Sequence, residues 1–121
     1  MTDYVYLGNQ RNGKKGVSTY VYCQIAQEAV QGLAQGNLAG QFLLNETKKG
    51  PKIIARVDKR NHVSIEIEIS LIGEKDAQSC CAEIQKAVYE AIDDLLETPP
   101  SKVNVAVSRL AVKADERKQG K

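Results

Sequence analysis

Three cysteines carry the most reactive side chains of this chain. They are Cys23, Cys80 and Cys81, and the last two are neighbours in the sequence. A thiol pair could serve redox chemistry or metal binding, but a metal site needs several Cys or His ligands at set spacings, and no such group accompanies this pair. Adjacent cysteines rarely close a disulfide, because the bridge strains the peptide between them. We interpret Cys81 as a small hydrophobic residue on the core face of a helix and Cys80 as partly exposed, in a protein that stays reduced.

The side chains suited to acid–base chemistry lack the partners that catalysis needs. His62 is the only histidine of the chain, and a general base needs both an orienting partner and a pocket. Glu90, Asp93 and Asp94 could suggest an acidic metal site. Carboxylates on one exposed helix face are usually solvated, however, and the Asp/Asn/Gly spacing of a calcium loop is missing. The sequence therefore predicts no enzyme: no catalytic residue, no metal site and no cofactor.

A short basic loop is the one motif that points to nucleic acid. Gly13, Lys14, Lys15 and Gly16 match the GxxG loop with which KH domains clamp a nucleic-acid backbone. In KH domains this loop joins two helices, whereas no helix pattern precedes it here. Further basic residues surround a later hairpin, namely Lys48, Lys49, Lys52, Arg56, Lys59 and Arg60. A flexible turn is the simpler interpretation, and a KH-like single-stranded RNA-binding module that uses Lys14 and Lys15 is the alternative function.

The elements that would position these residues centre on an alternating stretch from His62 to Ile72. Aliphatic residues alternate there with Ser and Glu, which predicts a strand with one apolar and one polar face. Residues 52–58 form a second predicted strand. Pairing Val57 with Val63 places the apolar residues of both strands on one face. This register leaves a three-residue loop that ends at Asn61, a residue that tolerates the left-handed conformation such loops need.

The polar face of this predicted hairpin carries one residue that is out of place. The register sets Lys52 opposite Glu68, which is a favourable cross-strand pair. It also sets Ile54 opposite Glu66, so that an apolar side chain lies among charged ones. The candidate interaction surface therefore comprises Ile54, Arg56, Glu66 and Glu68, and a small open sheet also leaves edges that can pair.

Two helices and a third strand complete the expected domain. Helical spacing of apolar residues predicts helices at about 19–34 and about 77–97. In the first helix the apolar stripe is Val21, Ile25, Ala29 and Leu33, with Tyr22 and Ala26 beside it. In the second helix the predicted core stripe is Cys81, Ile84, Val88, Ile92 and Leu95. Alternating valines predict a strand over 101–107, with a bulge or strand end near Arg109. Residues 36–51 are too apolar for an exposed loop, and we expect a short helical turn or a partial strand there.

The order of these elements defines the fold class. Helix, strand, strand, helix and strand make a two-layer α+β domain, α-β-β-α-β, with a small mixed three-stranded sheet and two helices packed on one face. The third strand is expected to run parallel to the 62–72 strand. We expect a flexible N-terminal arm over residues 1–16, a single α+β domain over 17–112 and a disordered charged tail over 113–121.

Length and composition fit one small domain with an aliphatic core. The chain has 121 residues, no Trp and a single Phe, so Ile, Val, Leu and Ala must fill the core. Its 17 Lys plus Arg and 15 Asp plus Glu give a net charge of +2, which is too balanced to indicate a polyanionic partner. No secretory segment opens the chain, and no apolar run approaches the roughly 20 residues needed to span a bilayer. We therefore expect a cytoplasmic protein without direct membrane insertion.

Several motifs recur in the order found in a known family. They are a hairpin of alternating aliphatic residues from Ile53 to Leu71, a helix with the run Ile84–Val88, and the run KVNVAV over residues 102–107. Gly16-Val17-Ser18, followed by Ile25-Ala26, is similar to the opening helix of that family. With these motifs, over residues 16–110, the chain resembles the alkaline shock protein 23 family of small bacterial envelope-stress proteins.

The resemblance implies a Gram-positive-type bacterial cytoplasmic protein without enzymatic activity, and no catalytic residues come with the family. Such proteins are often oligomeric and act near the membrane through a partner protein. What the resemblance implies is thus a self-associating interaction or scaffold protein of cell-envelope stress response or homeostasis. Its partners would be itself and a small membrane-anchored protein at the membrane periphery. A nucleic-acid partner is not expected under this interpretation and belongs to the alternative function.

Overall fold

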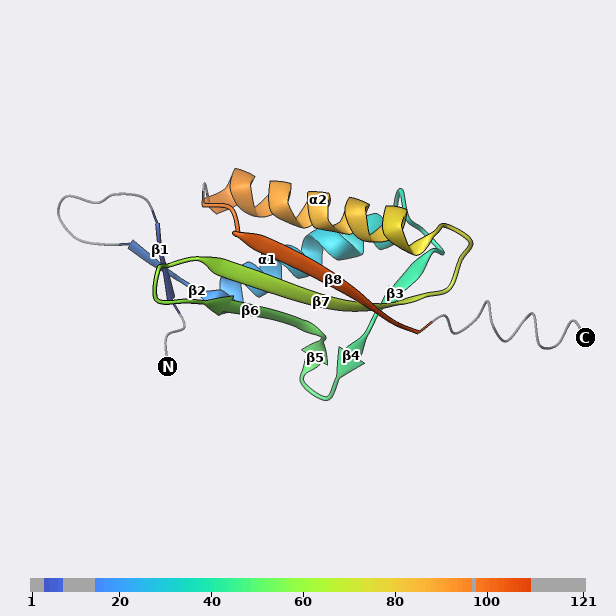
Figure 1. The fold of residues 1–121 in the computed structure, drawn as a ribbon, viewed down its shortest axis with the longest axis horizontal. Helices are drawn as coiled ribbons and strands as arrows, with labels where there is room; N and C mark the ends of the chain where they lie inside the picture. The colour runs from blue at the N-terminus through green and yellow to red at the C-terminus, as the bar shows by residue number, and fades with distance from the viewer. Residues whose placement is uncertain (1–3, 8–14, 97, 110–121) are drawn as a thin grey trace, which may run out of the picture.

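The computed structural model describes residues 4–7, 15–96 and 98–109. The helices of this part of the chain are α1 (Thr19–Ala34) and α2 (Ala77–Leu96), which pack against each other. Its strands are β1 (Tyr4–Leu7), β2 (Lys15–Ser18), β3 (Phe42–Leu44), β4 (Glu46–Thr47), β5 (Gly50–Pro51), β6 (Ile53–Val57), β7 (Val63–Leu71) and β8 (Lys102–Arg109). Figure 1 shows α1 and α2 on the same side of the main sheet. The predicted α+β class is confirmed.

The central strand of the main sheet is β7, the stretch with the clearest alternation in the sequence. β8 runs parallel to it along one edge, from Ser64 to Ser70, as predicted. On the other edge, β6 pairs antiparallel with the first part of β7 and β3 pairs antiparallel with its last part. The sheet therefore has four strands where the sequence predicted three. The additional strand is β3, which is the partial strand considered for residues 36–51.

The edge shared by β3 and β6 is interrupted by a short excursion of the chain. The Asn45 N–H donates to the Glu68 carbonyl at 3.0 Å, and the Glu68 N–H donates to the Lys52 carbonyl at 3.2 Å. Residues on both sides of the interruption thus bond to one residue of β7. Between them, β4 and β5 form a small antiparallel hairpin that leaves the sheet (Figure 1). β3 and β6 are accordingly two halves of one broken edge strand.

The β6–β7 hairpin has the register that the alternation predicted. Val57 lies opposite Val63, and Asn61 has a φ of 66°, the left-handed conformation expected at the end of the turn. On the other side of β7, the register with β8 shifts immediately before Arg109. The predicted irregularity near this residue is therefore confirmed as a bulge.

The core lies between the helices and the face of β7 that carries its odd-numbered residues. The β7 side chains buried in it are Val63, Ile65, Ile67, Ile69 and Leu71. They pack with buried residues of both helices, with Leu38 and with Phe42. Burying one such aliphatic side chain stabilises the fold by roughly 1.5–3 kcal/mol. The aliphatic core predicted from composition is therefore what holds the two layers together.

The buried face of α2 differs from the predicted stripe at both ends. The predicted residues that are fully buried are Ile84, Val88 and Ile92. Cys80 continues this line with no exposed surface, whereas Cys81 is half-buried and Leu95 is 67% exposed. The prediction that Cys81 is the core cysteine and Cys80 the exposed one was wrong. The buried residues are all four positions apart, and each step of four turns the line by about 40° around the helix. The predicted stripe mixed steps of three and four, so it diverges from the buried line at its two ends.

The buried line of α1 lies beside the one predicted. Tyr22, Ala26 and Val30 have no exposed surface. The predicted stripe, Val21, Ile25, Ala29 and Leu33, is half-buried at every position. Tyr22 fits the interior because its hydroxyl donates to the Thr98 carbonyl at 3.3 Å, which satisfies its polar end. Apolar spacing alone did not distinguish two adjacent lines on this helix.

The expected N-terminal arm contains paired strands. β1 pairs antiparallel with β2, with Tyr4 opposite Ser18 and Leu7 opposite Lys15. β2 leads directly into α1, where the Ser18 hydroxyl caps the helix by accepting from the Tyr20 N–H at 3.0 Å. Residues 4–7 and 15–16 are therefore β-structure in place of an arm. Residues 8–14, with Lys14, and the predicted tail over 113–121 lie outside the described residues.

Candidate interaction surface

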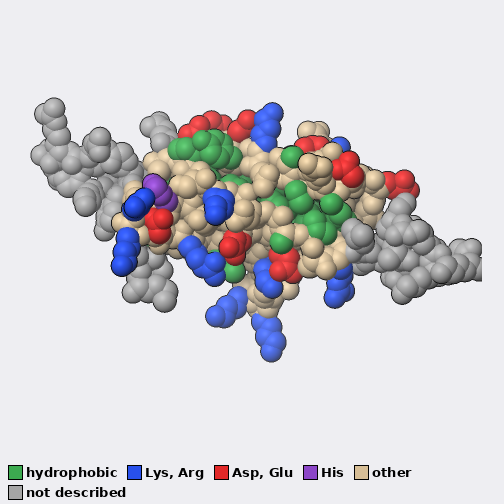
Figure 2. Space-filling view, viewed as in Figure 1, with side chains coloured by type: hydrophobic (Ala, Val, Ile, Leu, Met, Phe, Trp, Pro, Cys, Tyr) green, Lys and Arg blue, Asp and Glu red, His purple; other side chains and the backbone are tan. Residues whose placement is uncertain are grey.

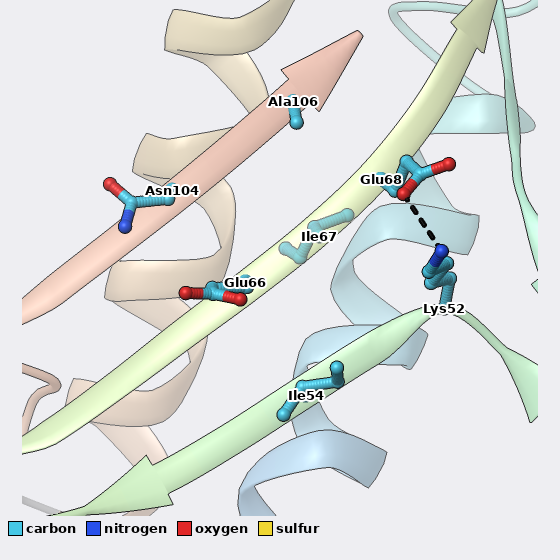
Figure 3. A pocket seen from close by; sticks show the side chains of 7 residues that line it. All are labelled: Lys52, Ile54, Glu66, Ile67, Glu68, Asn104 and Ala106. Atoms are coloured by element: carbon cyan, nitrogen blue, oxygen red, sulfur yellow. Dashed lines mark ion pairs between the residues drawn. The ribbon is translucent and has the colours of Figure 1, made fainter. Parts of the chain in front are cut away.

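The sheet face turned away from the helices carries the residues that the sequence singled out. We call this surface the outer face, and it comprises Lys52, Ile54, Arg56, Glu66, Glu68, Asn104 and Ala106. In Figure 3, six of these side chains surround a shallow hollow formed by the broken edge strand, β7 and β8. The structure therefore brings all four residues of the predicted surface, Ile54, Arg56, Glu66 and Glu68, onto one face.

Ile54 is the apolar centre of this face. It lies opposite Glu66 in a regular antiparallel ladder, and 38% of it is exposed. Beside it is a hollow of about 260 Å³, which Asn104 and Ala106 of β8 close on the far side. Small-molecule pockets usually measure about 300–1,000 Å³ and are deeper. The hollow beside Ile54 lies just below that range.

Charged side chains form two rows on this face, and Ile54 lies within the β6 row, between Lys52 and Arg56. Lys52 Nζ lies 3.1 Å from Glu68 Oε1, which confirms the predicted cross-strand pair. Arg56 Nη1 lies 3.4 Å from Glu66 Oε1. Figure 2 shows acidic and basic side chains interspersed over this sheet, with the basic ones extending along the rim at β6 and the β4–β5 hairpin. Because both ion pairs are solvent-exposed, they add little stability, and their main effect is to fix the positions of the charges.

A polar network supports the outer face at the break in the edge strand. The Asn45 side-chain amide donates to Glu68 Oε2 at 2.7 Å and to Ser108 Oγ at 2.6 Å. Its carbonyl oxygen accepts from Ser70 Oγ at 2.7 Å. The Asn45 amide, followed by the Lys52 ammonium, lowers the pKa of Glu68 below its usual range. The network therefore keeps Glu68 ionised and in place, and a second, polar hollow of about 400 Å³ lies over it.

The two hydroxyl groups of this network bond to its other members. Ser70 is almost fully buried, and its hydroxyl donates to an amide oxygen and not to a basic group. Ser108 donates to the Ile69 carbonyl at 3.3 Å. The Ser108 hydroxyl also bonds to the Glu68 carboxylate and contributes to lowering its pKa. Both hydroxyls therefore help to hold the charges of the outer face in place.

His62 and the acidic residues of α2 also lie apart from any site. His62 is exposed, and its Nδ1 lies 3.8 Å from Asp58 Oδ2. Asp58 holds the turn, since its other oxygen accepts from the His62 and Arg60 N–H groups at 2.9 and 2.8 Å, and the His62 amide contributes most to lowering the pKa of Asp58. Glu90, Asp93 and Asp94 are exposed on α2. Within the described part of the chain, no three His, Cys, Asp or Glu side chains group as metal ligands.

The cysteines are dispersed between the core and one sheet edge. Cys80 of α2 is buried in the core, and the neighbouring Cys81 is half-buried. Cys23 of α1 lies against the outer edge of β6, where its thiol donates to the Ile53 carbonyl at 3.6 Å. Burial raises the pKa of all three thiols. A raised pKa disfavours the reactive thiolate, so these cysteines are suited to packing.

The GxxG motif, residues 13–16, ends within strand β2. Lys15 and Gly16, its last two residues, belong to β2, and Lys14 lies outside the described residues. In a KH domain the motif links two helices, whereas here β2 precedes α1 directly. The placement of Lys15 in a strand thus differs from the KH arrangement.

The fold and the outer face together define a two-layer α+β domain with one sheet face that no described helix covers. No protein-family model, curated protein or solved structure matches the chain. The resemblance to the alkaline shock protein 23 family therefore stays a prediction from the motifs. In the part of the chain that is described, neither helix is sufficiently long and apolar to cross a membrane.

Sequence reasoning missed the residues that support the outer face. Asn45 directly follows β3, Ser70 belongs to β7 and Ser108 belongs to β8. These three side chains meet only because β3 joins the sheet. Leu43 of β3 lies opposite Ser70 and is exposed on the same face of the sheet. The sequence did not indicate that it belongs to this face. The available signal was the apolar run Phe42–Leu44, which is too short to reveal its own periodicity.

Proposed function

We propose that this chain is a non-enzymatic interaction module that self-associates through the outer face. The observation that carries the proposal is Ile54, an apolar side chain that is 38% exposed at the centre of charged residues. Single exposed aliphatic residues are common on proteins. Ile54 differs because a regular ladder holds it rigidly beside a hollow of side-chain size.

The arrangement of charge on this face favours a second copy of the chain as the partner. Lys52 and Arg56 form a basic row, and Glu66 and Glu68 form a parallel acidic row on β7. A two-fold axis lying between two stacked sheets places the basic row of each copy over the acidic row of the other. Ile54, which lies in the basic row between Lys52 and Arg56, then packs over the acidic row of the other copy. A self-complementary surface of this kind is what an isologous dimer requires.

Substitution of Ile54 tests this proposal directly. Ile54→Glu replaces the apolar side chain with an anion that faces the acidic row of the other copy, and it should shift a concentration-dependent assembly toward smaller species, as measured by size-exclusion chromatography with light scattering. Leu95→Glu is the matched control, because it makes the same kind of change at a 67%-exposed leucine on the helical layer. A monomeric wild-type protein at high concentration would refute self-association. Equal effects of the two substitutions would refute the assignment to this face.

Charge reversal tests the complementarity of the two rows. Arg56→Glu places like charges opposite each other between copies and should weaken association by about tenfold, which corresponds to about 1.4 kcal/mol of binding free energy. Adding Glu66→Arg to the same chain exchanges the two charges and should restore association. If the double variant associates as weakly as the single one, the rows do not face each other.

The cellular part of the proposal rests on the resemblance to the alkaline shock protein 23 family. On this basis the protein acts in the cytoplasm in envelope stress response or homeostasis, at the membrane periphery through a small membrane-anchored partner. Tagged wild-type protein should recover that partner from solubilised membranes of the native host. Recovery of cytoplasmic proteins alone would argue against the membrane-peripheral role.

Binding of single-stranded RNA is the second candidate function. The observation that favours it is a set of exposed cations at the two hairpin turns, Lys48, Lys49, Lys59 and Arg60. Phosphate contacts from such residues predict binding that weakens steeply with salt, and substitution of Lys14 and Lys15 should abolish it. Absence of an RNA mobility shift at low salt would end this candidate.

A further inference from the structure

The outer edge of β8 carries unpaired backbone groups. Among the described strands, β8 pairs only with β7. Because the Glu68 N–H bonds toward the broken edge strand, the odd-numbered residues of β7 bond toward β8, and the even-numbered residues of β8 complete that ladder. The backbone groups of β8 that point away from the sheet belong to Val103, Val105 and Val107. The bond of 2.9 Å from the Gln85 side chain to the Val103 carbonyl agrees with this direction.

At the opposite edge of the sheet, helix α1 protects the outward backbone groups of β6. On β6, the Cys23 thiol donates to the Ile53 carbonyl at 3.6 Å and accepts from the Ala55 N–H. Helix α1 therefore covers the outward groups of β6 with a side chain. Such covering is a common way in which proteins keep an edge strand from pairing with another chain.

The β8 edge has much less protection. Gln85 covers one carbonyl, at Val103, and the groups of Val105 and Val107 have no such cover among the described hydrogen bonds. The strand is eight residues long, contains no proline, and has charged side chains only at its two ends, Lys102 and Arg109. Its three valines stay half-buried although they face the helical layer. Both the backbone and the apolar side chains of this edge are therefore available to another strand.

The sequence of the edge is complementary to itself. Residues 103–107 read VNVAV, so an antiparallel pairing centred on Val105 sets Val105 against its own copy and Val103 against Val107. Lys102 then meets Ser108, and no like charges lie opposite each other. We propose that β8 of one copy pairs antiparallel with β8 of a second copy in this register, which joins the two sheets into one. This interface is separate from the outer face and does not depend on it.

A hollow next to the edge suits the incoming strand. Its volume is about 370 Å³, and it lies between α2 and the start of β8. The α2 residues that line it are Ala82, Gln85, Lys86 and Tyr89. In the proposed register, Val107 of the second copy lies opposite Val103 and enters this hollow. Tyr89, which is 44% exposed, would then be covered.

Amide hydrogen exchange distinguishes edge pairing from any contact through the outer face. The Val105 and Val107 N–H groups point to solvent in a single copy and should exchange rapidly at low protein concentration. In the paired form they are hydrogen-bonded, and their exchange should slow by about tenfold or more, because it then requires dissociation. Asn104 and Ala106, which bond to β7, should be protected at every concentration and serve as internal controls.

Two variants complete the experiment in the full chain. Ile54→Glu disables the outer face and should leave the concentration-dependent protection of Val105 and Val107 intact. Val105→Pro removes the outward N–H without removing a bond to β7, and it should abolish edge pairing as measured by light scattering in the Ile54→Glu background. Val105→Ala, which keeps the N–H, is the matched control and should still pair.

The other outcomes each overturn the edge proposal. Rapid exchange of Val105 and Val107 at all concentrations would show that the edge stays open, even if assembly through the outer face persists. Protection that is independent of concentration would show that the chain's own residues cover the edge. Loss of pairing in Val105→Ala as well as Val105→Pro would trace any association to the valine side chain and not to strand addition.

Discussion

Replacing Ile92 with alanine should destabilise the protein far more than the same change at Leu95. Ile92 has no exposed surface, whereas Leu95 is 67% exposed, although both lie on α2. The isoleucine substitution removes three carbon atoms, which at ~0.8 kcal/mol per buried methylene gives about 2.4 kcal/mol of lost transfer free energy. The cavity left in the core raises the expected loss to about 3–4 kcal/mol. At Leu95, about one third of the transfer value applies, which is below ~1 kcal/mol.

Urea unfolding followed by far-ultraviolet circular dichroism measures this difference. With a typical slope of about 1–3 kcal/mol per molar urea, the Ile92→Ala loss should lower the unfolding midpoint by at least ~1 M. Ile92→Val keeps most of the side chain and should lose about 0.5–1.5 kcal/mol. Similar losses for Ile92→Ala and Leu95→Ala would refute the buried line of α2 described above. They would support instead the stripe predicted from residue spacing, which includes Leu95.

Three further predictions concern the turn, the thiols and one carboxylate. Asn61→Val should lower the free energy of unfolding by about 1–2 kcal/mol, because a β-branched residue is strained in the left-handed conformation. Asn61→Gly accepts that conformation and should lose less in the same urea assay. A thiol reagent should modify Cys23 and Cys81 before Cys80, which has no exposed surface. Every rate should keep rising above the ordinary thiol pKa of about 8.5, because the thiolate is the reactive form and burial raises all three pKa values. Mass spectrometry showing early modification of Cys80 would contradict the fold. The stability that ionised Glu68 contributes should be present above the ordinary glutamate pKa of about 4.3 and lost as the pH falls through its lowered pKa. Glu68→Gln should therefore flatten the acid side of the stability profile.

The sheet was predictable where side-chain alternation left only one solution. A slip of one residue between β6 and β7 would turn every apolar side chain of one strand into solvent. Asn61 independently indicated the same register, since few residues accept its φ of 66°. The two signals also placed Ile54 on the polar face. The four residues of the candidate surface could thus be located together from the sequence alone.

Features that depend on contacts between distant segments were not predictable in the same way. β3 has only three residues, too few to show a period, and it is recognisable as a strand only through its pairing with β7. The network around Asn45 follows from that pairing, so it was missed as well. On each helix, two neighbouring apolar lines had similar spacing. The position of the partner elements decided between them, and Cys80 was buried in place of Cys81 as a result.

The broken edge strand has a consequence for protein engineering. Asn45 and Lys52 both bond to Glu68, so the sheet is continuous across the break whatever the chain does between them. Lengthening a loop whose ends are held costs little, about 0.6 kcal/mol for each doubling of its length. A fluorescent domain or affinity tag inserted between Lys48 and Lys49, at the exposed tip of the excursion, should leave the strand pairing intact. Such an insertion would put a reporter beside the outer face without altering a residue of it.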